Sequence, residues 1–558
     1  MSGQEQSDVP ISKFASTEQT HQPVAASNLP GTMGRSRTSS TTAITAQALN
    51  DNNETSLEET HILVVDWDGP DDPTHPRNWP GRKKWLATLA VSLFSLISPI
   101  SSSMIAPAAG QVGQEFNIHN GTTQSMIVSA FVLAYGTLIA ICVTYYAYEL
   151  SSAVGPLVLS PLSEVYGRSR VLQIANLFFL AFNIGCAFAK NTSQMIAFRF
   201  LSGLGGSAPL SVGGGVLSDM FSADERGKAI SIYSLAPLIG PVIGPIAGAW
   251  ISQETTWRWV FRSSSIADAM VQVIGLWFLR ETYPPLLLKW KAAALRKQMD
   301  TEKGSRRVLT VDEVNAPPRS WEETLVRALV RPFALFIQEP IIQLFGLYLS
   351  ISYGIVYLSL TTIPSIFTDI YHEKIGFVGL HYIALGLGLF MTSQVHSRLL
   401  DKVYIHHKNM NGGVGKPEYR LPTSIVLSLG LPFGLLISGW AAEKAVHWIV
   451  VDIGLFLVGM GTIAAFQAMQ TYIVDAFTLY AASALASVSC LRSTAGFAFP
   501  LFAPKMYQAL GYGKGNTILA AASCVLGSPT LYLFWVYGER VRNMSKRTRE
   551  AVKHSGKN

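Results

Sequence analysis

Long apolar runs alternate with short polar stretches along most of this chain. A helix needs about 20 apolar residues to cross roughly 30 Å of hydrocarbon, and most of the runs reach that length. Six runs precede a polar stretch between Glu281 and Glu339, and six follow it. The predicted spans are residues 85–106, 126–162, 171–189, 195–217, 229–251, 259–279, 340–367, 376–392, 421–442, 446–470, 480–502 and 516–536. The pattern predicts an all-α integral membrane protein with twelve transmembrane helices in two six-helix, pseudo-symmetric halves.

The segments outside the spans complete the predicted organisation. Residues 1–80 are polar and poor in aromatic side chains, so they bury too little apolar surface to offset the entropy of ordering. We therefore expect a disordered tail there, and no signal-peptide pattern opens it. The other predicted units are a first half at 81–282, a central loop at 283–338, a second half at 339–540 and a C-terminal tail at 541–558.

The second span is too long for one crossing. Its residues 126–162 would form a helix of roughly 55 Å, nearly twice the hydrocarbon thickness. Removing residues 136–152 would join Tyr135 to Ala153 and leave about 30 Å. We hypothesise that this segment is an insert, either a translated intron or a feature of one isoform. The alternative is a long, tilted and broken second helix.

Composition and charge support a membrane protein and orient it. Hydrophobic residues make up 49% and charged residues only 14% of the 558 residues, against about 25% charged in soluble domains. The net charge of +7 lies mostly in alternate loops and the tails, which places both termini in the cytosol by the positive-inside rule. Nucleic acid is not needed to explain it. The four cysteines fall inside apolar runs, so we expect neither a disulfide framework nor a metal site.

A charged hairpin joins the second and third spans. Gly167 allows a sharp turn, while Glu164, Arg168 and Arg170 place charge at the membrane surface. These residues resemble the loop signature of the major facilitator superfamily. The echo Asp401-Lys402-Val403-Tyr404 after the eighth span is consistent with two related halves.

Other residues inside the spans are candidates for mechanism. In the fifth span, glycines at i, i+4 and i+8 form one stripe beside two prolines that favour a bend. We interpret this as a functional bend at the interface of the halves; the alternative is generic small-residue packing. The residues are Gly240, Pro241, Gly244, Pro245 and Gly248.

Charges within the spans are costly, at least about 2.5–3.5 kcal/mol each, and usually face a cavity or a partner. Arg199 with Gly203 resembles the superfamily's fourth-helix signature, which implies proton coupling; the alternative is that Arg199 extends to the headgroups. The sequence around Arg492 resembles that of the fungal antiporters of the superfamily. Asp268 and Asp452 are either functional or structural counter-ions.

Taken together, the motifs resemble the fungal twelve-spanner drug:proton antiporter family. That resemblance implies proton-coupled export of a drug, toxin or secondary metabolite, multidrug resistance, and a functional monomer in the plasma membrane. The proton gradient replaces any cofactor, and no metal site or P-loop is present in the sequence. The first span has Ser101, Ser102 and Ser103 but no acid, which favours neutral or amphipathic organic substrates over cations.

Asn120 and Asn191 begin glycosylation sequons on the outer side, with Asn191 close to the membrane.

The rival functions are an uptake carrier or polyamine exporter of the same fold, and a transporter-like sensor that signals through its tails. An enzyme is not expected, because neither a histidine cluster nor a nucleophile motif is present in the sequence.

Overall fold

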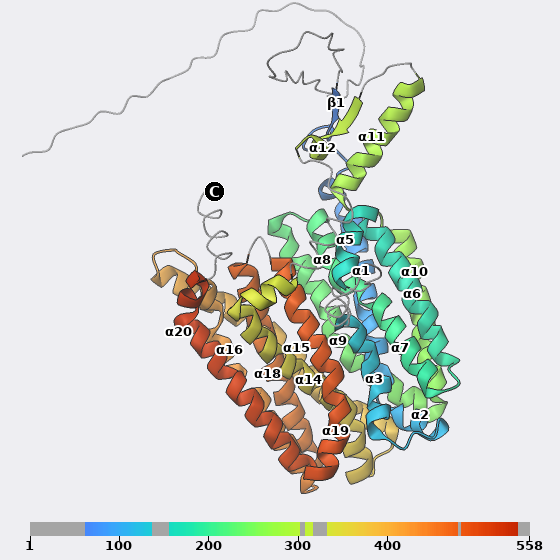
Figure 1. Cartoon of the computed structure of the whole chain (residues 1–558), viewed down its shortest axis with the longest axis vertical. Coiled ribbons are helices and arrows are strands. Elements are labelled where there is room, and N and C mark those ends of the chain that lie inside the picture. Colours follow the sequence, from blue (N-terminus) through green and yellow to red (C-terminus); the bar gives the residue numbers. More distant parts are fainter. Residues whose placement is uncertain (1–61, 137–155, 302–306, 316–331, 478–480, 545–558) are drawn as a thin grey trace, which may run out of the picture. The chain divides into compact units, whose positions relative to one another are not determined.

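The computed structural model of this chain describes residues 62–136, 156–301, 307–315, 332–477 and 481–544, and nearly all of these residues are helical (Figure 1). The insert hypothesised at 136–152 lies outside them, except that Gly136 ends a helix. Helices before the central segment are α1 (Gly81–Met104), α2 (Ala109–Glu115), α3 (Gly121–Gly136), α5 (Pro156–Tyr166), α6 (Arg168–Ala187), α7 (Thr192–Gly206), α8 (Ala208–Met220), α9 (Ala223–Glu254) and α10 (Trp257–Phe278).

The second group of helices follows the central segment. They are α14 (Pro340–Ser365), α15 (Ile375–Met410), α16 (Pro422–Leu427), α17 (Gly430–Glu443), α18 (Trp448–Ala476), α19 (Ala481–Leu526) and α20 (Ser528–Met544), with a π-helix η2 at Ile366–Ile370 and a 3-10 helix η3 at Pro417–Arg420. Within α19, Gly511 has φ 77° and ψ 172°, a backbone conformation that breaks the helix. This residue separates the eleventh and twelfth predicted spans.

Most of the predicted membrane-spanning helices correspond to observed ones. Nine helical stretches within the described residues are long and apolar enough to cross a bilayer. One of them, Ser483–Asn543, contains Gly511 and is 61 residues long, roughly 90 Å as a continuous helix, which is enough for two crossings. The second predicted span and α10 are not among the nine. The all-helical bundle is therefore confirmed, while the number of twelve crossings stays a prediction.

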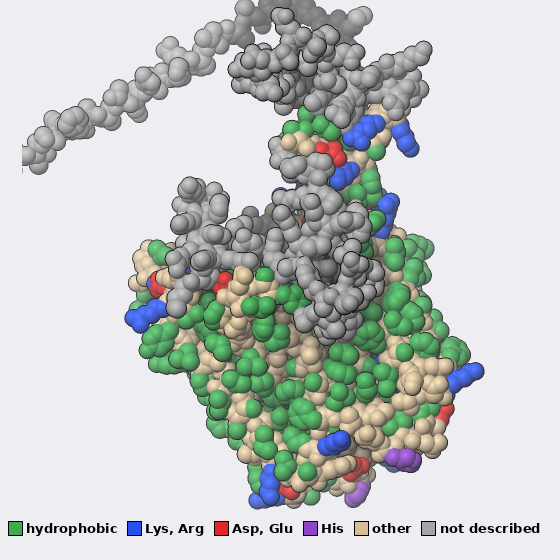
Figure 2. Space-filling view, viewed as in Figure 1, with side chains coloured by type: hydrophobic (Ala, Val, Ile, Leu, Met, Phe, Trp, Pro, Cys, Tyr) green, Lys and Arg blue, Asp and Glu red, His purple; other side chains and the backbone are tan. Residues whose placement is uncertain are grey.

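The outside of the bundle is apolar, as a lipid-facing surface must be. Figure 2 shows hydrophobic side chains covering much of the visible bundle, with charged groups mainly near its ends. Ile174 and Val395 are more than 60% exposed, although each lies well inside a helix. Such exposure of large apolar residues would destabilise a soluble protein, so it marks the surface that meets the acyl chains.

Helix packing joins the two groups along two seams. Helix α9 packs on α15 across one seam, and α3 packs on α19 across the other. Inside the groups, α1 lies against α9 and α14 lies against α19. Helices α1 and α14 are thus the buried centres of their halves, with most of their residues inside.

The prediction of a disordered tail over residues 1–80 is wrong for its last part. Residues 62–65 form strand β1 (Ile62–Val65), and residues 76–78 form the 3-10 helix η1 (Pro76–Asn78). Strand β1 pairs in parallel with β2 (Arg307–Thr310), in the register Ile62 to Arg307. The apolar run Ile-Leu-Val-Val can order because it has this partner from the central segment.

The central segment itself contains more structure than the predicted loop. Helix α11 (Pro284–Thr301) precedes β2, and α12 (Val311–Asn315) follows it. Val65 and Ala292 are buried together, with Leu63 and Leu295 packed against them. The segment before α1 and the segment after α10 therefore form one small unit, which we call the N-terminal clip (residues 62–80, 284–301 and 307–315).

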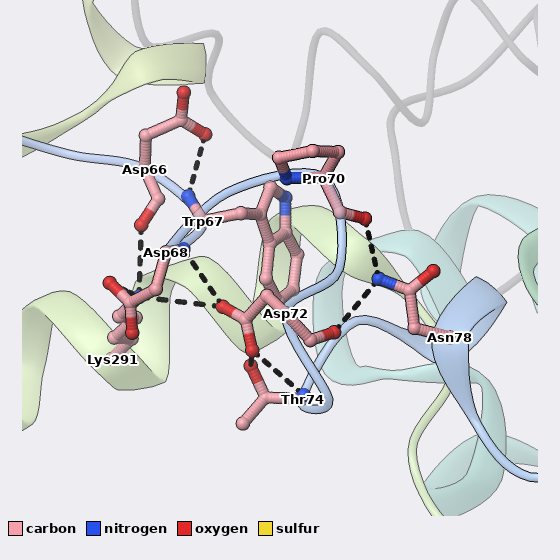
Figure 3. Close-up of polar contacts among 8 residues, drawn as sticks. All are labelled: Asp66, Trp67, Asp68, Pro70, Asp72, Thr74, Asn78 and Lys291. Atoms are coloured by element: carbon pink, nitrogen blue, oxygen red, sulfur yellow. Dashed lines mark hydrogen bonds and ion pairs between the residues drawn. The ribbon is translucent and has the colours of Figure 1, made fainter. Parts of the chain in front are cut away.

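Asp72 is the polar centre of this clip (Figure 3). Its carboxylate accepts hydrogen bonds from the Thr74 hydroxyl at 2.6 Å and from the backbone N–H groups of Thr74 and Asp68. Lys291 of α11 lies 2.8 Å from Asp68 and 3.7 Å from Asp72, and also donates to the Asp66 carbonyl. Burial alone would raise the pKa of Asp72, but the hydrogen bonds and the Lys291 charge outweigh it and lower that pKa below its usual value.

Candidate functional site

Arg199 lies at the centre of the first half and is fully buried. Its guanidinium donates to the carbonyls of Ser101 (2.9 Å) and Ser102 (2.7 Å) on α1, and to those of Ile127 and Val128 on α3. The two α1 carbonyls belong to the last turn of that helix, where no further helical N–H is available to them. The positive charge thus meets the negative end of the α1 dipole, so extension to the headgroups is excluded.

Arg199 holds three helices together. Gly203, one turn further along α7, permits the close approach, because a Cβ there would lie 2.8 Å from the Ala134 side chain and still nearer the Phe131 carbonyl on α3. The guanidinium also sits 4.8 Å from the ring of Phe131, a cation–π contact. The structure brings the two predicted residues into one α1–α3–α7 contact. Their role in proton coupling stays a prediction.

Hydroxyl groups line the contact between the halves beside Arg199. Ser98 of α1 donates to the Gly206 carbonyl at 2.7 Å, so the hydrogen bond between Ser98 and Tyr135 of α3 is donated by Tyr135. Ser102 of α1 lies 3.4 Å from the hydroxyl of Tyr357 on α14, which belongs to the other half. Of these buried serine and tyrosine contacts, the one between Ser102 and Tyr357 joins the two halves. Sequence reasoning identified only the serine run.

The glycine stripe of α9 faces α1 within the same half. A Cβ at Gly240 would lie 2.6 Å from the Pro99 side chain, and one at Gly244 would lie 2.5 Å from Ser103 Oγ. Gly248 lies against the Met104 backbone in the same way. The interpretation of this stripe as the interface between the halves is therefore wrong, because that interface uses another face of α9. Helix α9 runs without a break from Ala223 to Glu254 through Pro241 and Pro245.

The other face of α9 carries the seam to α15. Val242 lies against Gly386 and Ala249 lies against Gly379, where an added Cβ would come within 2.6 Å of either side chain. Gln253 accepts a hydrogen bond from the Gly376 N–H at 2.8 Å. At this seam, the glycines that permit close approach between the halves are thus on α15.

Asp268 of α10 is fully buried against α6. Its Oδ1 accepts from Asn176 at 3.0 Å, and Asn176 also donates to Gln272. Its Oδ2 has no hydrogen-bond partner among the described residues, and no cation pairs with it there. The described contacts therefore give no support to a counter-ion role for Asp268.

The charged hairpin is tied to both of its neighbours in space. The Arg168 side chain lies 3.2 Å from Asp219 at the end of α8 and 3.7 Å from Glu164, and donates to the Ser163 hydroxyl. Gly167 has φ 105°, a value that favours glycine. The hairpin signature thus forms a compact ion-pair network, and its role in gating stays a prediction.

Two partners of this hairpin were not identified from the sequence. Glu281, just after α10, accepts from the backbone N–H groups of Arg168 and Ser169 and so caps the N-terminus of α6. Asp219 is the other. Arg170 is exposed and lies 5.0 Å from the ring of Trp290 on α11. Nothing in the run Glu281-Thr-Tyr-Pro-Pro predicts a capping carboxylate.

The second half contains a matching network around Arg420. This side chain in η3 lies 2.6 Å from Asp475 at the end of α18 and 3.3 Å from Asp401 on α15, with the Tyr404 ring 4.5 Å away. Asp401 and Asp475 correspond in position to Glu164 and Asp219. The weak sequence echo at 401–404 therefore reflects a real structural repeat.

Asp452 belongs to a cluster around His381. Its carboxylate lies 2.9 Å from Nδ1 of His381, and Glu373 lies 2.8 Å from Nε2 of the same ring. The ring stacks on Phe367 at 3.5 Å. A neutral imidazole can donate from one nitrogen only, so both contacts can be donated together only by the doubly protonated ring. Asp452 is thus paired with a histidine that the sequence did not single out.

Arg492 of α19 faces a small cavity in the second half. The cavity, of about 20 Å³, lies between α14, α18 and α19 and has room for roughly one water molecule. The guanidinium carbon lies 4.5 Å from the ring of Tyr353 and 5.2 Å from that of Phe466. The structure does not bring Arg492 together with Arg199, which belongs to the other half.

The predicted glycosylation acceptors lie at helix starts. The Asn191 side chain accepts from the Gln194 N–H and caps α7, and Asn120 accepts from the Thr122 N–H just before α3. Both side chains are exposed, and their modification stays a prediction.

A two-halved helical membrane bundle with buried polar residues where the halves meet defines a secondary transporter. The family model of the Major Facilitator Superfamily matches residues 91–504, and the chain belongs to that superfamily. It is therefore a multi-pass membrane protein, and its relatives are transporters rather than enzymes.

Curated fungal relatives support the same assignment. The chain is 43% identical over 483 residues to "Efflux pump vrtL" of Penicillium aethiopicum, covering 87% of this chain and 91% of that protein. It is 38% identical over 541 residues to "Efflux pump radE" of Floropilus chiversii, covering 96% of this chain and 93% of that protein. The predicted membership of the superfamily, close to fungal efflux pumps, is confirmed.

Solved structures share the fold alone. A bacterial homologue of the lysosomal transporter Spinster, in an inward-facing conformation, superposes with a TM-score of 0.55 at 12% identity, over 84% of this chain and 99% of that one. The xylose transporter XylE of E. coli gives 0.55 at 13% identity, over 82% and 98%.

Proposed function

We propose that this protein exports small organic compounds in exchange for protons, by alternating access between two six-helix halves. The substrate class is a drug, toxin or secondary metabolite, and multidrug resistance would be the cellular result. The printed names of two relatives, both efflux pumps, support the direction of transport. The observation that carries the mechanism is the buried contact between Ser102 of α1 and Tyr357 of α14, because it joins the two halves at the centre of the bundle.

The geometry is consistent with movement of one half against the other. Within the first half, α9 and Arg199 both fasten to α1, so the helices on this side are tied into one unit. Across the α9–α15 seam, the contacting side chains are small and mostly apolar, since Val242 and Ala249 of α9 meet glycines of α15. Side chains that interlock little offer little resistance to a change of contact, so this seam suits a rocking motion.

The energetics of proton exchange are sufficient for export. One proton moving inward at about 100 mV supplies about 2.3 kcal/mol, and each pH unit adds about 1.4 kcal/mol. Two pH units bring the sum to roughly 5 kcal/mol, enough for a gradient on the order of a thousandfold. We propose that both termini are cytosolic, that the protein works as a monomer in the plasma membrane, and that no cofactor is required.

Inside-out vesicles test the proposal directly. Vesicles with an acidic lumen should accumulate a labelled organic substrate, and a protonophore should abolish the accumulation. An uptake carrier or polyamine exporter of the same fold would give the opposite direction or take up labelled spermidine instead. A sensor would show no accumulation of any compound, and that result would overturn the proposal.

A further inference from the structure

His381, near the start of α15, is held between two carboxylates from different elements. Its Nε2 lies 2.8 Å from Glu373 in the connection that precedes α15, and its Nδ1 lies 2.9 Å from Asp452 of α18. The ring stacks on Phe367 of η2 at 3.5 Å, and Trp448 lies 5.5 Å away in a T-shaped contact. The cluster therefore joins η2, α15 and α18 at one end of the second half.

This arrangement has places for two N–H donors, and only the charged ring fills both. In a neutral imidazole one nitrogen carries a lone pair, which here would face a carboxylate with no proton between them. The charged ring donates to Glu373 and Asp452 at once, and charge-assisted hydrogen bonds are about twice as strong as neutral ones. The stacked ring of Phe367 suits the same state, because an aromatic face attracts a cation. The geometry of the cluster thus fits a ring that carries one extra proton.

The surroundings of the cluster add no competing positive charge. Within the described part of the chain, the charged groups that act on the His381 ring are Glu373 and Asp452. Tyr371 is the other titratable group near these carboxylates, and its hydroxyl donates to the Val446 carbonyl. Other titratable residues of the two adjoining loops are exposed, namely Asp369, His372, Lys374 and His447. The Glu373 side chain is 23% exposed, so water can bring a proton to the cluster.

The cluster also lies beside the seam between the halves. The N–H of Gly376, one turn before His381, donates to Gln253 of α9 at 2.8 Å. Gly379 of the same turn packs on Ala249 of α9. Loosening the start of α15 therefore acts directly on the contact between α15 and α9.

This end of the seam is remote from the charged hairpin. Helix α9 begins at Ala223, shortly after Asp219, which pairs with Arg168 of the hairpin. It then runs for 32 residues to Glu254, and its last turn is the one that meets the start of α15. With both termini cytosolic, as proposed above, the cluster faces the outer side, from which the exchanged protons enter.

We propose that His381, Glu373 and Asp452 form a proton-binding site, and that the bound proton holds the α14–α15 connection closed against α15 and α18. One proton from the outer solution binds to the unprotonated ring nitrogen, and both carboxylates stay ionised. When that proton leaves, one carboxylate loses its donor and is repelled by the lone pair, so the more exposed Glu373 is released. This inference rests on the proposed proton exchange and assigns it a residue outside the Arg199 contact.

Nitrogen NMR of the histidine rings tests the site without any transport substrate. The full-length protein is labelled with nitrogen-15 histidine and reconstituted in liposomes, and the His381 signals are identified by their absence in His381→Gln. At about pH 7.5 an ordinary histidine carries its second proton in only about a tenth of the molecules. We expect both ring nitrogens of His381 to be protonated in the wild type at this pH.

Amide variants of the carboxylates assign the extra proton. In Glu373→Gln or Asp452→Asn, the new side-chain N–H can donate to an unprotonated ring nitrogen, so the neutral ring satisfies both contacts. Each variant should therefore show one unprotonated nitrogen at the same pH. His396 is the matched control in α15, because its ring contacts the neutral groups of Gln467 and Ser424. The signals lost in His396→Gln should belong to a ring with a single N–H.

Hydrogen exchange tests whether the proton closes the connection. Amide exchange of residues 366–375 is measured at about pH 6 and about pH 9, on either side of the usual range of histidine titration. Rates are divided by those of an unstructured peptide at each pH. In the wild type the corrected rate should rise several-fold at the higher pH. In Glu373→Gln it should stay constant, because the neutral ring already satisfies both neighbours.

The outcomes separate this inference from the proposed function. An unprotonated nitrogen of wild-type His381 at about pH 7.5, or a second proton kept in both amide variants, would overturn the proton site. Equal corrected exchange of the wild type at the two pH values would overturn the closure. Vesicle export could still succeed in these cases. Conversely, a proton held by His381 supports the site even if vesicles show no proton-driven transport, and unaltered melting temperatures of the variants would exclude misfolding.

Discussion

At the scale of single residues, a buried arginine can have a structural role that is distinct from its predicted role in transport. Arg199 was predicted to serve proton coupling, and its surroundings now show how much of the fold it holds. A cation satisfied by four carbonyls stabilises the α1–α3–α7 contact whether or not it also takes part in transport. Any variant at this position must therefore be judged by stability as well as by activity.

Arg199→Ala should lower the stability of the folded protein and abolish transport, yet leave membrane insertion intact. The substitution leaves buried carbonyls without their donor, and each such group costs about 1–3 kcal/mol, so we expect a loss of at least about 3 kcal/mol. Thermal unfolding in detergent measures it. Arg262→Ala is the control, since among the described residues the contacts of Arg262 are with aromatic rings. Wild-type melting of Arg199→Ala would contradict the assignment.

Asp72→Asn should open the N-terminal clip at neutral pH. The neutral amide keeps the size of the side chain but loses the charge that Lys291 and two backbone N–H groups stabilise. Trypsin should then cleave after the exposed Arg77 several-fold faster than in the wild type. Asp71→Asn, at the exposed neighbouring position, should cleave at the wild-type rate.

The same carboxylate predicts how the clip responds to acid. Because the pKa of Asp72 is lowered in the fold, its contribution is complete above the unfolded value of about 3.9. It is lost as the pH falls through the lower, folded pKa. The fluorescence of Trp67 should therefore stay constant down to about pH 4 and change below it, and Asp72→Asn should remove that transition. A transition near pH 6 in the wild type would point to a different group.

At the scale of helices, small residues decide which faces can meet. Helix α9 uses glycines toward α1, whereas toward α15 it uses larger side chains that meet glycines of the partner. Periodicity alone identified the stripe correctly but could not say which neighbour it faces. One face of α9 therefore packs on α1 within the first half, and another face packs on α15 of the second half.

Gly244→Ala should destabilise the protein by about 1–3 kcal/mol, the usual cost of an overfilled contact. The added Cβ would lie 2.5 Å from Ser103 Oγ and 2.6 Å from the Ile100 carbonyl, so α1 and α9 would have to separate. Gly214→Ala is the matched control in α8, because nothing lies within 4 Å of its added Cβ. Melting temperatures that change equally in both variants would refute the packing of this stripe on α1.

At the scale of the whole molecule, the sequence predicted the bundle better than its polar contacts. Apolar length and loop charge are local properties, so the positions of the spans follow from them. Glu281 caps α6 from a distance of more than 110 residues along the chain, and Arg420 pairs with Asp475 from 55 residues away. No local pattern specifies such pairs. The run Ile62–Val65 was an available signal for a strand, but its partner lies beyond six spans.

The hypothesised insert makes a prediction for the entire first half. Helix α3 ends at Gly136 and α5 begins at Pro156, so a variant without residues 136–152 should join them into one crossing. We expect this variant to fold with unchanged or higher stability, measured by melting in detergent. Mass spectrometry of the native protein should recover a peptide that joins Tyr135 to Ala153. Recovery of only peptides from within 136–152 would contradict the insert.

The clip between β1 and β2 has a mechanical consequence. Without it, the tether between the halves would run from the end of α10 to the start of α14. Because β1 holds β2, and Lys291 fastens α11 to the segment before α1, the chain up to Asn315 stays bound to the first half. In the proposed alternating-access motion, only the part of the connection that follows Asn315 is then left to link the clip to α14, and releasing Asp72 would lengthen that link.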